Sequence, residues 1–301
     1  MKLSINVDDF GNSLRISEHI LECCESPVGV DRLSIMPTGN AFKFAVDNYE
    51  KISRKPRISV HINLFEGMPC LPAVEIPSLV RPDGRFRHSF PTLLAVSLYG
   101  NRGQQERLTR DLHSEIDAQV RTVIEGLSTS AEIEIDGHQH CHMIPIVSDV
   151  VESISSRYQI SSVRMPRERF FWCGGHGLLN YIGPNVMKHF LLNFLAEKAR
   201  KKAYKNFENG ERYFIGVLFT GNMSYESLVH AVRALEEGQP GENAVVDILL
   251  HPGGASKGEE AQWRGQSSFK AYYTSKWRAR EKELFYDSRL VDLLSYYRRA
   301  L

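Results

Sequence analysis

The stretch KLSINVDDFG, residues 2–11, alternates apolar and polar residues and ends in two adjacent carboxylates and a Phe-Gly turn. Asn12 and Ser13 then open a helical spacing, so the chain is expected to begin with a strand–helix unit that carries charge where the strand ends. Functional side chains of α/β barrels collect at the C-terminal ends of strands. Neighbouring carboxylates at Asp8 and Asp9 favour a bound cation or a shared proton. The alternative is a turn residue followed by a helix cap.

The rest of the chain repeats this strand–helix alternation. Such an order is typical of a parallel sheet with helices outside it. We therefore predict an α/β fold in which residues 1–301 form one β/α barrel, TIM-like and seven-stranded. One strand lies in the opening stretch, and the other six are expected at 28–36, 57–64, 132–138, 161–165, 211–219 and 244–250. Helices are expected at 13–24, 41–49, 104–127, 145–156 and 225–235, with a mostly helical tail.

Two insertions interrupt the alternation, at about residues 66–103 and 167–200. The first is rich in proline and turns, and its place after the third strand predicts a lid that faces the substrate. The second is rich in aromatic residues and glycine and leads into a helix with an apolar stripe and a basic end. The stripe, formed by Val186, Phe190, Leu191 and Phe194, is expected in the core or at a subunit interface. A lipid-binding surface is the alternative.

Composition excludes several classes of protein. The net charge of the 301 residues is +1, from 37 basic and 36 acidic side chains, so bulk charge gives no reason to expect nucleic acid or an anionic membrane as a partner. The chain enters a strand at once and has no long apolar run, so neither a secretory signal nor a membrane span is expected. Its five cysteines form no CxxC pair and are expected as reduced thiols of a cytoplasmic protein.

A histidine cluster follows the fourth predicted strand. Alternate residues of a strand share one face, so Asp136, His138, His140 and His142 are expected to point together into the mouth of the barrel. A lone histidine here would more often be a hydrogen-bonded core residue. Imidazole and carboxylate together suit Zn²⁺ or another first-row divalent ion, and an oxygen-rich variant could hold Mg²⁺.

The other strand ends supply the remaining groups of a metal-dependent hydrolase. Asp9, His61 and His138 provide three ligands for one divalent ion, which would lower the pKa of a bound water and polarise a carbonyl. Asp8, next to the metal-binding carboxylate, would take the proton from that water as general base.

Two further residues complete this hypothesis. Arg164, after the fifth strand, can hold the base through two hydrogen bonds, and its alternative is a surface arginine on a loop. His251, exposed by the Pro-Gly-Gly that follows it, could protonate a leaving amine, and its alternative is a histidine at a helix boundary.

Five motifs in series closely resemble the YdjC/ChbG family of carbohydrate deacetylases. They are NVDDFG (6–11), HINLFEG (61–67), DGHQHCHM (136–143), RMP (164–166) and HPG (251–253). Each is weak alone, but together they occur in the order of the family and span most of the chain.

The resemblance implies a β/α barrel related to the polysaccharide deacetylases, often a homodimer, with one divalent ion such as Mg²⁺ or Zn²⁺. It also implies hydrolysis of an N-acetyl group from an amino sugar. The family's metal ligands correspond to Asp9, His61 and His138. By analogy with the broader deacetylase group, its base, the partner of the base and its acid correspond to Asp8, Arg164 and His251.

One departure from the family lies in the histidine motif, which often reads DSHHHVH. Here Gln139 and Cys141 replace family residues, but both are expected on the strand face opposite the ligands, with Cys141 packed. Substrate contacts are expected from four residues, of which the last suits stacking on a sugar ring: Asn63, His140, His142 and Trp172.

The sequence leaves alternatives open for function and substrate. A hydrolase of another amide or ester would use the same groups, and so would a sugar-binding or assembly protein with little turnover. The retained base and acid argue against the last of these. The sugar could be free, nucleotide-linked or lipid-linked, and Ni²⁺ or Co²⁺ would also suit the ligands.

Overall fold

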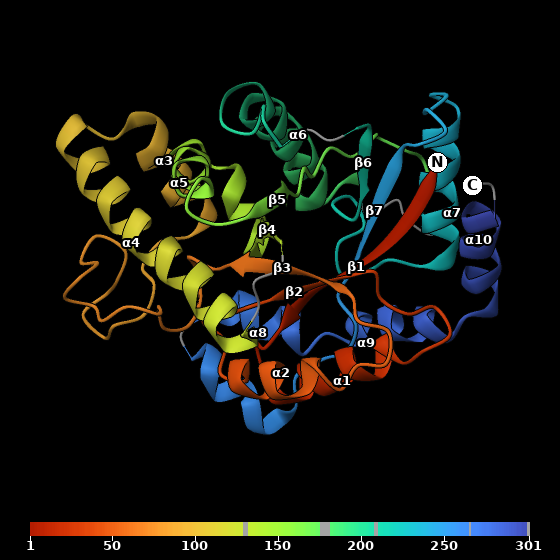
Figure 1. Cartoon of the computed structure of the whole chain (residues 1–301), viewed down its shortest axis with the longest axis horizontal. Coiled ribbons are helices and arrows are strands. Elements are labelled where there is room, and N and C mark those ends of the chain that lie inside the picture. The colour runs from red at the N-terminus through yellow and green to blue at the C-terminus, as the bar shows by residue number, and fades with distance from the viewer. Residues whose placement is uncertain (129–131, 175–180, 208–209, 265, 300–301) are drawn as a thin grey trace.

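The computed structural model describes residues 1–128, 132–174, 181–207, 210–264 and 266–299 as a curled parallel sheet surrounded by helices (Figure 1). The strands are β1 (Lys2–Phe10), β2 (Arg32–Ile35), β3 (Arg57–Ile62), β4 (Ile133–Gly137), β5 (Ile160–Val163), β6 (Arg212–Ile215) and β7 (Val245–Leu250). The α-helices are α1 (Leu14–Cys24), α2 (Phe42–Tyr49), α3 (Phe90–Tyr99), α4 (Arg102–Leu127), α5 (Pro145–Ser155), α6 (Pro184–Lys202), α7 (Tyr225–Glu236), α8 (Ser267–Tyr273), α9 (Lys276–Glu283) and α10 (Ser288–Arg299). Short 3₁₀ helices are η1 (His138–Met143), η3 (Lys257–Trp263) and η4 (Leu284–Tyr286).

The sheet confirms the predicted α/β fold with seven parallel strands. Their order is β5-β4-β3-β2-β1-β7-β6, so the two edge strands are β5 and β6. Among the described residues, one β-bridge connects the two edges, between Glu168, which follows β5, and Phe214 of β6. The fold is therefore a curled half-barrel and not a closed barrel. The Glu168 carboxylate spans the opening, because it accepts hydrogen bonds from the backbone N–H groups of Gly216 and Leu218 at 2.6 and 2.7 Å.

The strands alternate between two kinds of buried side chain. Apolar residues such as Ile5 and Val60 belong to the hydrophobic core, as helix-covered strands require. Polar residues at alternate positions meet one another instead. Ser34 of β2 donates a hydrogen bond to Asp136 of β4 at 2.6 Å, and the fully buried Arg32 contacts Asp247 of β7 at 3.4 Å. The curled sheet therefore contains a polar interior that leads to its C-terminal edge.

Local sequence signals set most of the helix boundaries. Ser13 caps α1, since its side chain accepts a hydrogen bond from the backbone N–H of Ile16, and Pro145 occupies the first turn of α5. Within the described ranges, no helix combines the length and the apolar character needed to cross a bilayer.

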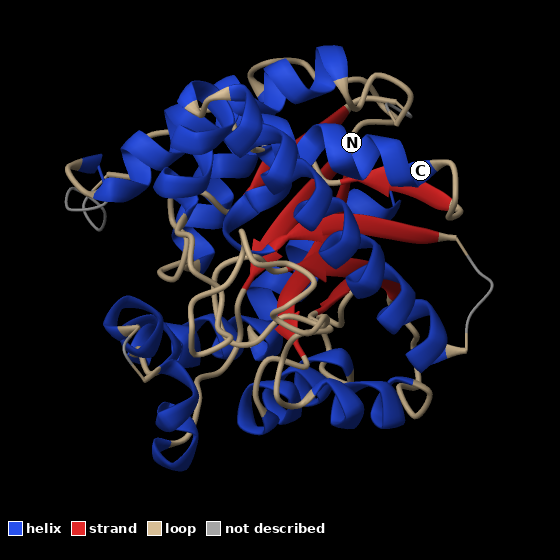
Figure 2. Cartoon of the chain, turned by 90° about the vertical axis from the view of Figure 1, so that its left-hand side faces the viewer, coloured by secondary structure: helices blue, strands red, loops and turns tan. Residues whose placement is uncertain are grey.

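The first insertion packs sideways against α4. The backbone N–H groups of Cys70 and Leu71 donate to the Glu115 carboxylate at 2.9 and 3.1 Å, and that of Ser78 donates to Asp111 at 2.8 Å. Buried acceptors on α4 therefore hold residues 70–78 beside this helix. Loops of the first insertion, on the left-hand side of Figure 1, lie in front of the strands in Figure 2, and the lid that faces the substrate stays a prediction.

The C-terminal segment also reaches the strand ends. From η3 to α9 it crosses beneath the sheet in Figure 1. Its aromatic side chains Phe269 and Tyr272 line the cavity described next.

Candidate metal and catalytic site

A cavity of about 230 Å³ lies at the C-terminal ends of the strands. Six of the residues predicted from sequence line it, namely Asp8, Asp9, His61, His138, His140 and His251. They come from β1, β3, the η1 turn and the loop after β7, four segments that are far apart in the sequence. The parallel sheet brings them together, because the C-terminal ends of its strands meet at one edge.

A bulge in β1 brings both of its carboxylates to the cavity. Neighbours in a regular strand point to opposite faces of the sheet. The pairing of β1 with β2 shifts register between Val7 and Phe10, and Asp9 has a left-handed backbone with φ of 71°. Such bulges redirect side chains near active sites, and Asp tolerates this conformation better than most residues. Asp8 and Asp9 can therefore line the same cavity.

His61 is held by a carboxylate behind it. Its Nδ1 donates a hydrogen bond to Asp136 at 2.6 Å, and this bond orients Nε2 toward Asp9. A carboxylate behind a ligating histidine is a common arrangement in metal sites. Burial disfavours the charged imidazole, but Asp8 and Asp136 outweigh it and raise the pKa of His61 to about 9. Metal binding would therefore release a proton from this residue.

The histidine motif does not continue β4, contrary to the prediction. The strand ends at Gly137, and residues His138–Met143 form the η1 turn, in which Gln139 and His140 have left-handed backbones. A side chain at Gly137 would meet Cys141 Sγ at 2.7 Å and His142 Nδ1 at 2.9 Å, so the tight turn requires glycine there.

The turn separates residues that were expected on one face. His138 and His140 line the cavity, whereas His142 is fully buried and does not. Of the two residues expected on the opposite face, Cys141 is packed, with its thiol 3.2 Å from the carbonyl oxygen of Ile62, whereas Gln139 lines the cavity.

The geometry of Asp9, His61 and His138 fits one divalent ion. Asp9 Oδ1 lies 3.8 Å from His61 Nε2 and 3.6 Å from His138 Nδ1, and one ligand atom from each residue lies within 4.8 Å of the others. Two ligands about 2.1 Å from one ion can be up to about 4.2 Å apart. The buried Nε2 of His61, which faces Asp9, finds no hydrogen-bond partner among the described residues, as an atom that awaits a ligand would.

A second group, formed by Asp8, His61 and Asp136, also has metal-ligand spacing. Its carboxylates are already bound by a cation, because Arg164 contacts both Asp8 and Asp136 at 2.8 Å. A metal ion there would face the guanidinium group, so the first group is the better candidate.

Arg164 holds Asp8 as the sequence predicted. Nη1 and Nη2 donate to the two oxygens of Asp8, each at 2.8 Å, and Nη2 also donates to Ser34 at 3.0 Å. Burial opposes ionisation of Asp8, but Arg164 and then His61 hold the pKa of this carboxyl well below its ordinary value. His142 fixes the backbone behind this pair, because its Nε2 donates to the carbonyl oxygen of Arg164 at 2.8 Å.

His251 lines the cavity beside Asp8 and Asp9. Its backbone N–H donates to the buried carboxylate of Glu281 at 2.6 Å, and its ring packs edge-on against Tyr272. Burial lowers the pKa of His251 to about 4, although the two aspartates oppose this effect. The imidazole is therefore neutral near pH 7 and can donate a proton only after it has gained one.

The C-terminal segment supplies positioning residues that sequence reasoning missed. Arg278 of α9 is fully buried, donates to Asp9 Oδ2 at 3.0 Å and to the carbonyl oxygen of Gly253 at 2.6 Å, and lies against the rings of Tyr272 and Tyr273. Because Arg278 occupies Oδ2, Oδ1 of Asp9 is left to face the histidines. In sequence, Arg278 belongs to a highly charged helix, and nothing local distinguishes it from the exposed Arg280.

Glu66 is a second missed residue, from the family motif that begins at His61. Tyr273 and Asn12 donate to its Oε1 at 3.0 and 2.8 Å. Its Oε2, which has no hydrogen-bond partner among the described residues, lies 3.7 Å from Nε2 of His138. Lys188 and Asn185 of α6 also line the cavity. They had no signal in the sequence beyond membership of the second insertion.

Three of the four predicted substrate contacts lie away from the cavity. His140 lines it, but His142 does not, as described above. Asn63 is buried nearby, where its side chain donates to Thr38 and to the carbonyl oxygen of Glu66. Trp172 is exposed and stacks on Tyr181 with ring centroids 4.5 Å apart. Residues 175–180 of the same insertion lie outside the described residues.

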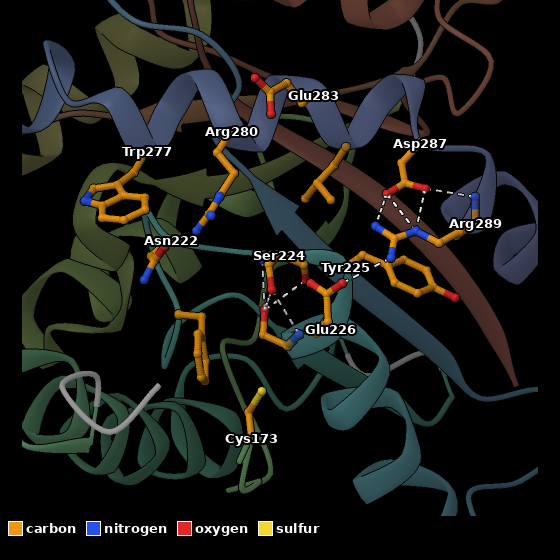
Figure 3. Close-up of a pocket in the computed structure, with 13 residues that line it drawn as sticks. Cys173, Asn222, Ser224, Tyr225, Glu226, Trp277, Arg280, Glu283, Asp287 and Arg289 are labelled. Atoms are coloured by element: carbon orange, nitrogen blue, oxygen red, sulfur yellow. Dashed lines mark hydrogen bonds and ion pairs between the residues drawn. The ribbon is translucent and has the colours of Figure 1, made fainter. Parts of the chain in front are cut away.

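A larger cleft of about 600 Å³ lies between α7 and α9 (Figure 3). Trp277 and Arg280 line one side of it, and Ser224, Tyr225 and Glu226 line the other. It contains none of the predicted site residues, and Arg289 in it is ion-paired to Asp287 and Glu226. The catalytic chemistry is therefore better placed at the strand ends.

Comparison with known proteins gives a consistent result over most of the chain. The family model described as YdjC-like protein matches residues 2–296. A carbohydrate deacetylase of Danio rerio is 28% identical over 250 residues, which cover 79% of this chain and 72% of the relative. A carbohydrate deacetylase of Mus musculus is 27% identical over 268 residues, which cover 84% of this chain and 78% of the relative.

A solved structure supports the fold. The crystal structure of a proposed cellobiose-phosphate cleavage protein from Enterococcus faecalis V583 superposes with a TM-score of 0.67. The match covers 98% of this chain and 94% of the other at 19% sequence identity, so it bears on architecture alone.

Proposed function

The chain belongs to the YdjC-like protein family, and from that premise we propose that it is a metal-dependent hydrolase of N-acetylated amino sugars. The reaction breaks the acetamide C–N bond with water, releases acetate and leaves a free amine on the sugar. One observation carries the proposal: a three-residue ligand set, an ionised carboxylate and a histidine line the same cavity at the strand ends. Carbohydrate deacetylase is also what the matched relatives are called.

Asp9, His61 and His138 would hold the ion, which we take to be Zn²⁺ or Mg²⁺. When bound, the ion supplies a water of lowered pKa and polarises the acetamide carbonyl. Asp136 and Arg278 support this site from behind, since each orients one ligand through a direct hydrogen bond.

Asp8 acts as the general base in this proposal. Arg164 keeps it ionised and fixes both of its oxygens, so the carboxylate meets the substrate already oriented and able to accept a proton from the attacking water. The pairing also limits how far Asp8 can rotate away.

His251 acts as the general acid. Because its imidazole is neutral in the free site, it must first receive a proton, and Asp8 in the same cavity is the group that gains one during attack. His251 then donates a proton to the nitrogen as the C–N bond breaks. The balance is complete: the hydroxyl group of water joins the acetyl carbon to give acetic acid, which ionises to acetate, and the other proton of water ends on the amine.

Substrate contacts follow from the lining of the cavity. Of the residues expected from sequence, His140 is retained, because its Nδ1 finds no hydrogen-bond partner in the described part of the chain. Lys188, Asn185 and Tyr272 join it as candidates, since each lines the same cavity.

The test is acetate release from a panel of N-acetylated sugars by metal-stripped protein, with and without added divalent ions. We expect release that depends on the ion, is lost in His138→Ala and is retained in His113→Ala, which changes a half-buried histidine of α4 outside the cavity. Tight metal binding without acetate from any sugar would refute deacetylation. It would leave a different scissile bond or a sugar-binding role.

A further inference from the structure

Helix α6 exposes a second apolar face. Its buried face packs Leu192, Leu195 and Ala196 into the core. Its outward face carries Met187, Phe190, Leu191 and Phe194, with 37% to 76% of each residue exposed. Three residues of the predicted stripe, Phe190, Leu191 and Phe194, therefore lie outside the core, whereas Val186 packs partly against it. A helix that is apolar on two sides is normally covered on both. The described residues cover only one side of this helix.

Aromatic residues of the preceding segment extend this face. The ring of Phe170 stacks on that of Phe190 with centroids 6.2 Å apart, and Phe170, Trp172 and Ile182 are each at least 44% exposed. We call these three residues and the four outward side chains of α6 the apolar patch. Contiguous exposed apolar patches usually mark protein or membrane interaction sites.

The same outward face of α6 becomes basic toward its C-terminus. Lys198 and Lys201 continue the helical spacing of Leu191 and Phe194, and all the lysines from 198 to 205 are exposed. The helix contains five basic side chains and one acidic one. Its acidic residue, Glu197, pairs with Arg200 and Lys201, and Lys202 pairs with Asp149 of α5. Such surface ion pairs are weak in water. The outward face therefore joins an apolar half to a cationic half.

A third face of α6 lines the catalytic cavity. Asn185 and Lys188 contribute to the lining of the cavity, and Met187, adjacent to Lys188, begins the outward stripe. Whatever covers the apolar patch must therefore lie beside the cavity. α6 also covers the junction of β5 and β6, where the sheet is open (Figure 1).

We propose that the apolar patch and the lysines of α6 dock on an anionic membrane surface, so that the cavity receives an amino sugar attached to a lipid. The proposal rests on the proposed deacetylation. Aromatic and aliphatic side chains beside lysines are the composition of helices that lie in the interface of anionic bilayers. An anionic bilayer accounts for both the apolar and the cationic half of the outward face, whereas a second copy of this chain accounts directly for the apolar half. The charge of this helix therefore favours the membrane.

The test measures flotation of the full-length, metal-loaded protein with two kinds of vesicle, phosphatidylcholine alone and phosphatidylcholine with phosphatidylglycerol. We expect binding to the anionic vesicles and little to the neutral ones. The double variant Phe190→Ser with Phe194→Ser and the double variant Lys198→Glu with Lys201→Glu should each reduce the bound fraction at least about tenfold. These four side chains lie on the surface, so the fold should survive.

Two matched controls change comparable residues elsewhere on the surface. Tyr99→Ser removes an aromatic residue of α3 that is 85% exposed, and Lys43→Glu removes a lysine of α2 that pairs with an acidic residue one turn away, as Lys201 does. Both controls should bind vesicles like the wild type. Binding lost equally in the controls would overturn the assignment to α6.

Other outcomes separate the possible failures. No vesicle binding overturns the proposal. If the protein is then a dimer by light scattering and the Phe190→Ser, Phe194→Ser variant is a monomer, the patch lies between two copies instead. Acetate release from soluble sugars without vesicle binding refutes only the docking surface. Vesicle binding without acetate release from soluble or lipid-linked N-acetyl sugars refutes only the proposed reaction.

Discussion

The substitution Asp8→Asn tests whether the two carboxylates of the opening stretch have different roles. Asn keeps the shape of Asp but cannot accept a proton from water. Removal of a general base typically lowers kcat by about 10²- to 10⁴-fold, or about 3–5 kcal/mol of barrier. Asp9 keeps its contact with Arg278 and its place near the two histidines, so metal affinity should change only a few-fold.

Asp8→Asn should lower the rate of the reaction and leave the protein folded. Arg164 retains its ion pair with Asp136 at 2.8 Å and its hydrogen bond from Nη2 to Ser34 at 3.0 Å when Asp8 becomes neutral. The guanidinium group is therefore not left unpaired. We expect a cost of about 1–3 kcal/mol in the free energy of unfolding.

Asp136→Asn provides the matched comparison, because Asp136 contacts the same guanidinium group but does not line the cavity. Its second role is to hold Nδ1 of His61 at 2.6 Å. Loss of such a support typically weakens metal binding by about 10- to 100-fold. At saturating metal, kcat should fall far less than in Asp8→Asn.

The assay combines calorimetric titration of metal-stripped protein with acetate release at saturating metal, for the wild type and both variants. We expect Asp8→Asn to lower kcat and Asp136→Asn to weaken metal affinity. If Asp8→Asn abolished metal binding, the ion would belong to the group of Asp8, His61 and Asp136, and Asp8 could not be the free base. Equal effects of both variants on kcat would show a shared structural role.

Three further predictions concern the acid, a buried cation and a buried carboxylate. His251→Gln should slow release of acetate from an amide by about 10²- to 10⁴-fold. It should slow release from an activated acetyl ester far less, because the ester leaving group needs no proton. An equal loss of rate on both substrates would refute the role of His251 as the acid. Arg278→Met leaves Asp9 without its buried cation and should lower the free energy of unfolding of metal-stripped protein, measured in urea, by about 3–5 kcal/mol. Arg278→Lys should restore part of this loss. Arg280→Met should lower the same quantity by no more than about 0.5 kcal/mol. Burial raises the pKa of Glu115 from 4.5 to about 7, so the stability due to its protonated form is present below about pH 4.5 and is lost as the pH rises through 7. The stability lost in this way is up to about 3 kcal/mol. Thermal unfolding of Glu115→Gln should therefore show a smaller loss of stability between about pH 5 and pH 8 than the wild type. An equal loss in both proteins would contradict the raised pKa of Glu115.

The sequence alone determined the strand order along the chain and the residues at the strand ends. Period-two alternation and turn residues are local signals, so they located each of the seven strands to within a few residues. Since parallel strands end at one edge, the order of the strands was enough to place the motifs at Asp9, His61 and His251 in one site. The bidentate contact of Arg164 with Asp8 could be predicted for the same reason, because the strands that precede these two residues end at that edge.

Only the tertiary structure decided how those side chains are aimed and what supports them. The β1 bulge and the η1 turn override the alternation that local pattern predicts, because backbone conformations such as the φ of 71° at Asp9 are stabilised by distant contacts. Arg278 and Tyr273 reach the site from the C-terminal segment, and no local pattern marks which residue of a charged or aromatic run will be buried. Periodicity gives a helix its faces, but packing decides which face is covered, and on α6 the packing left Phe190 outside.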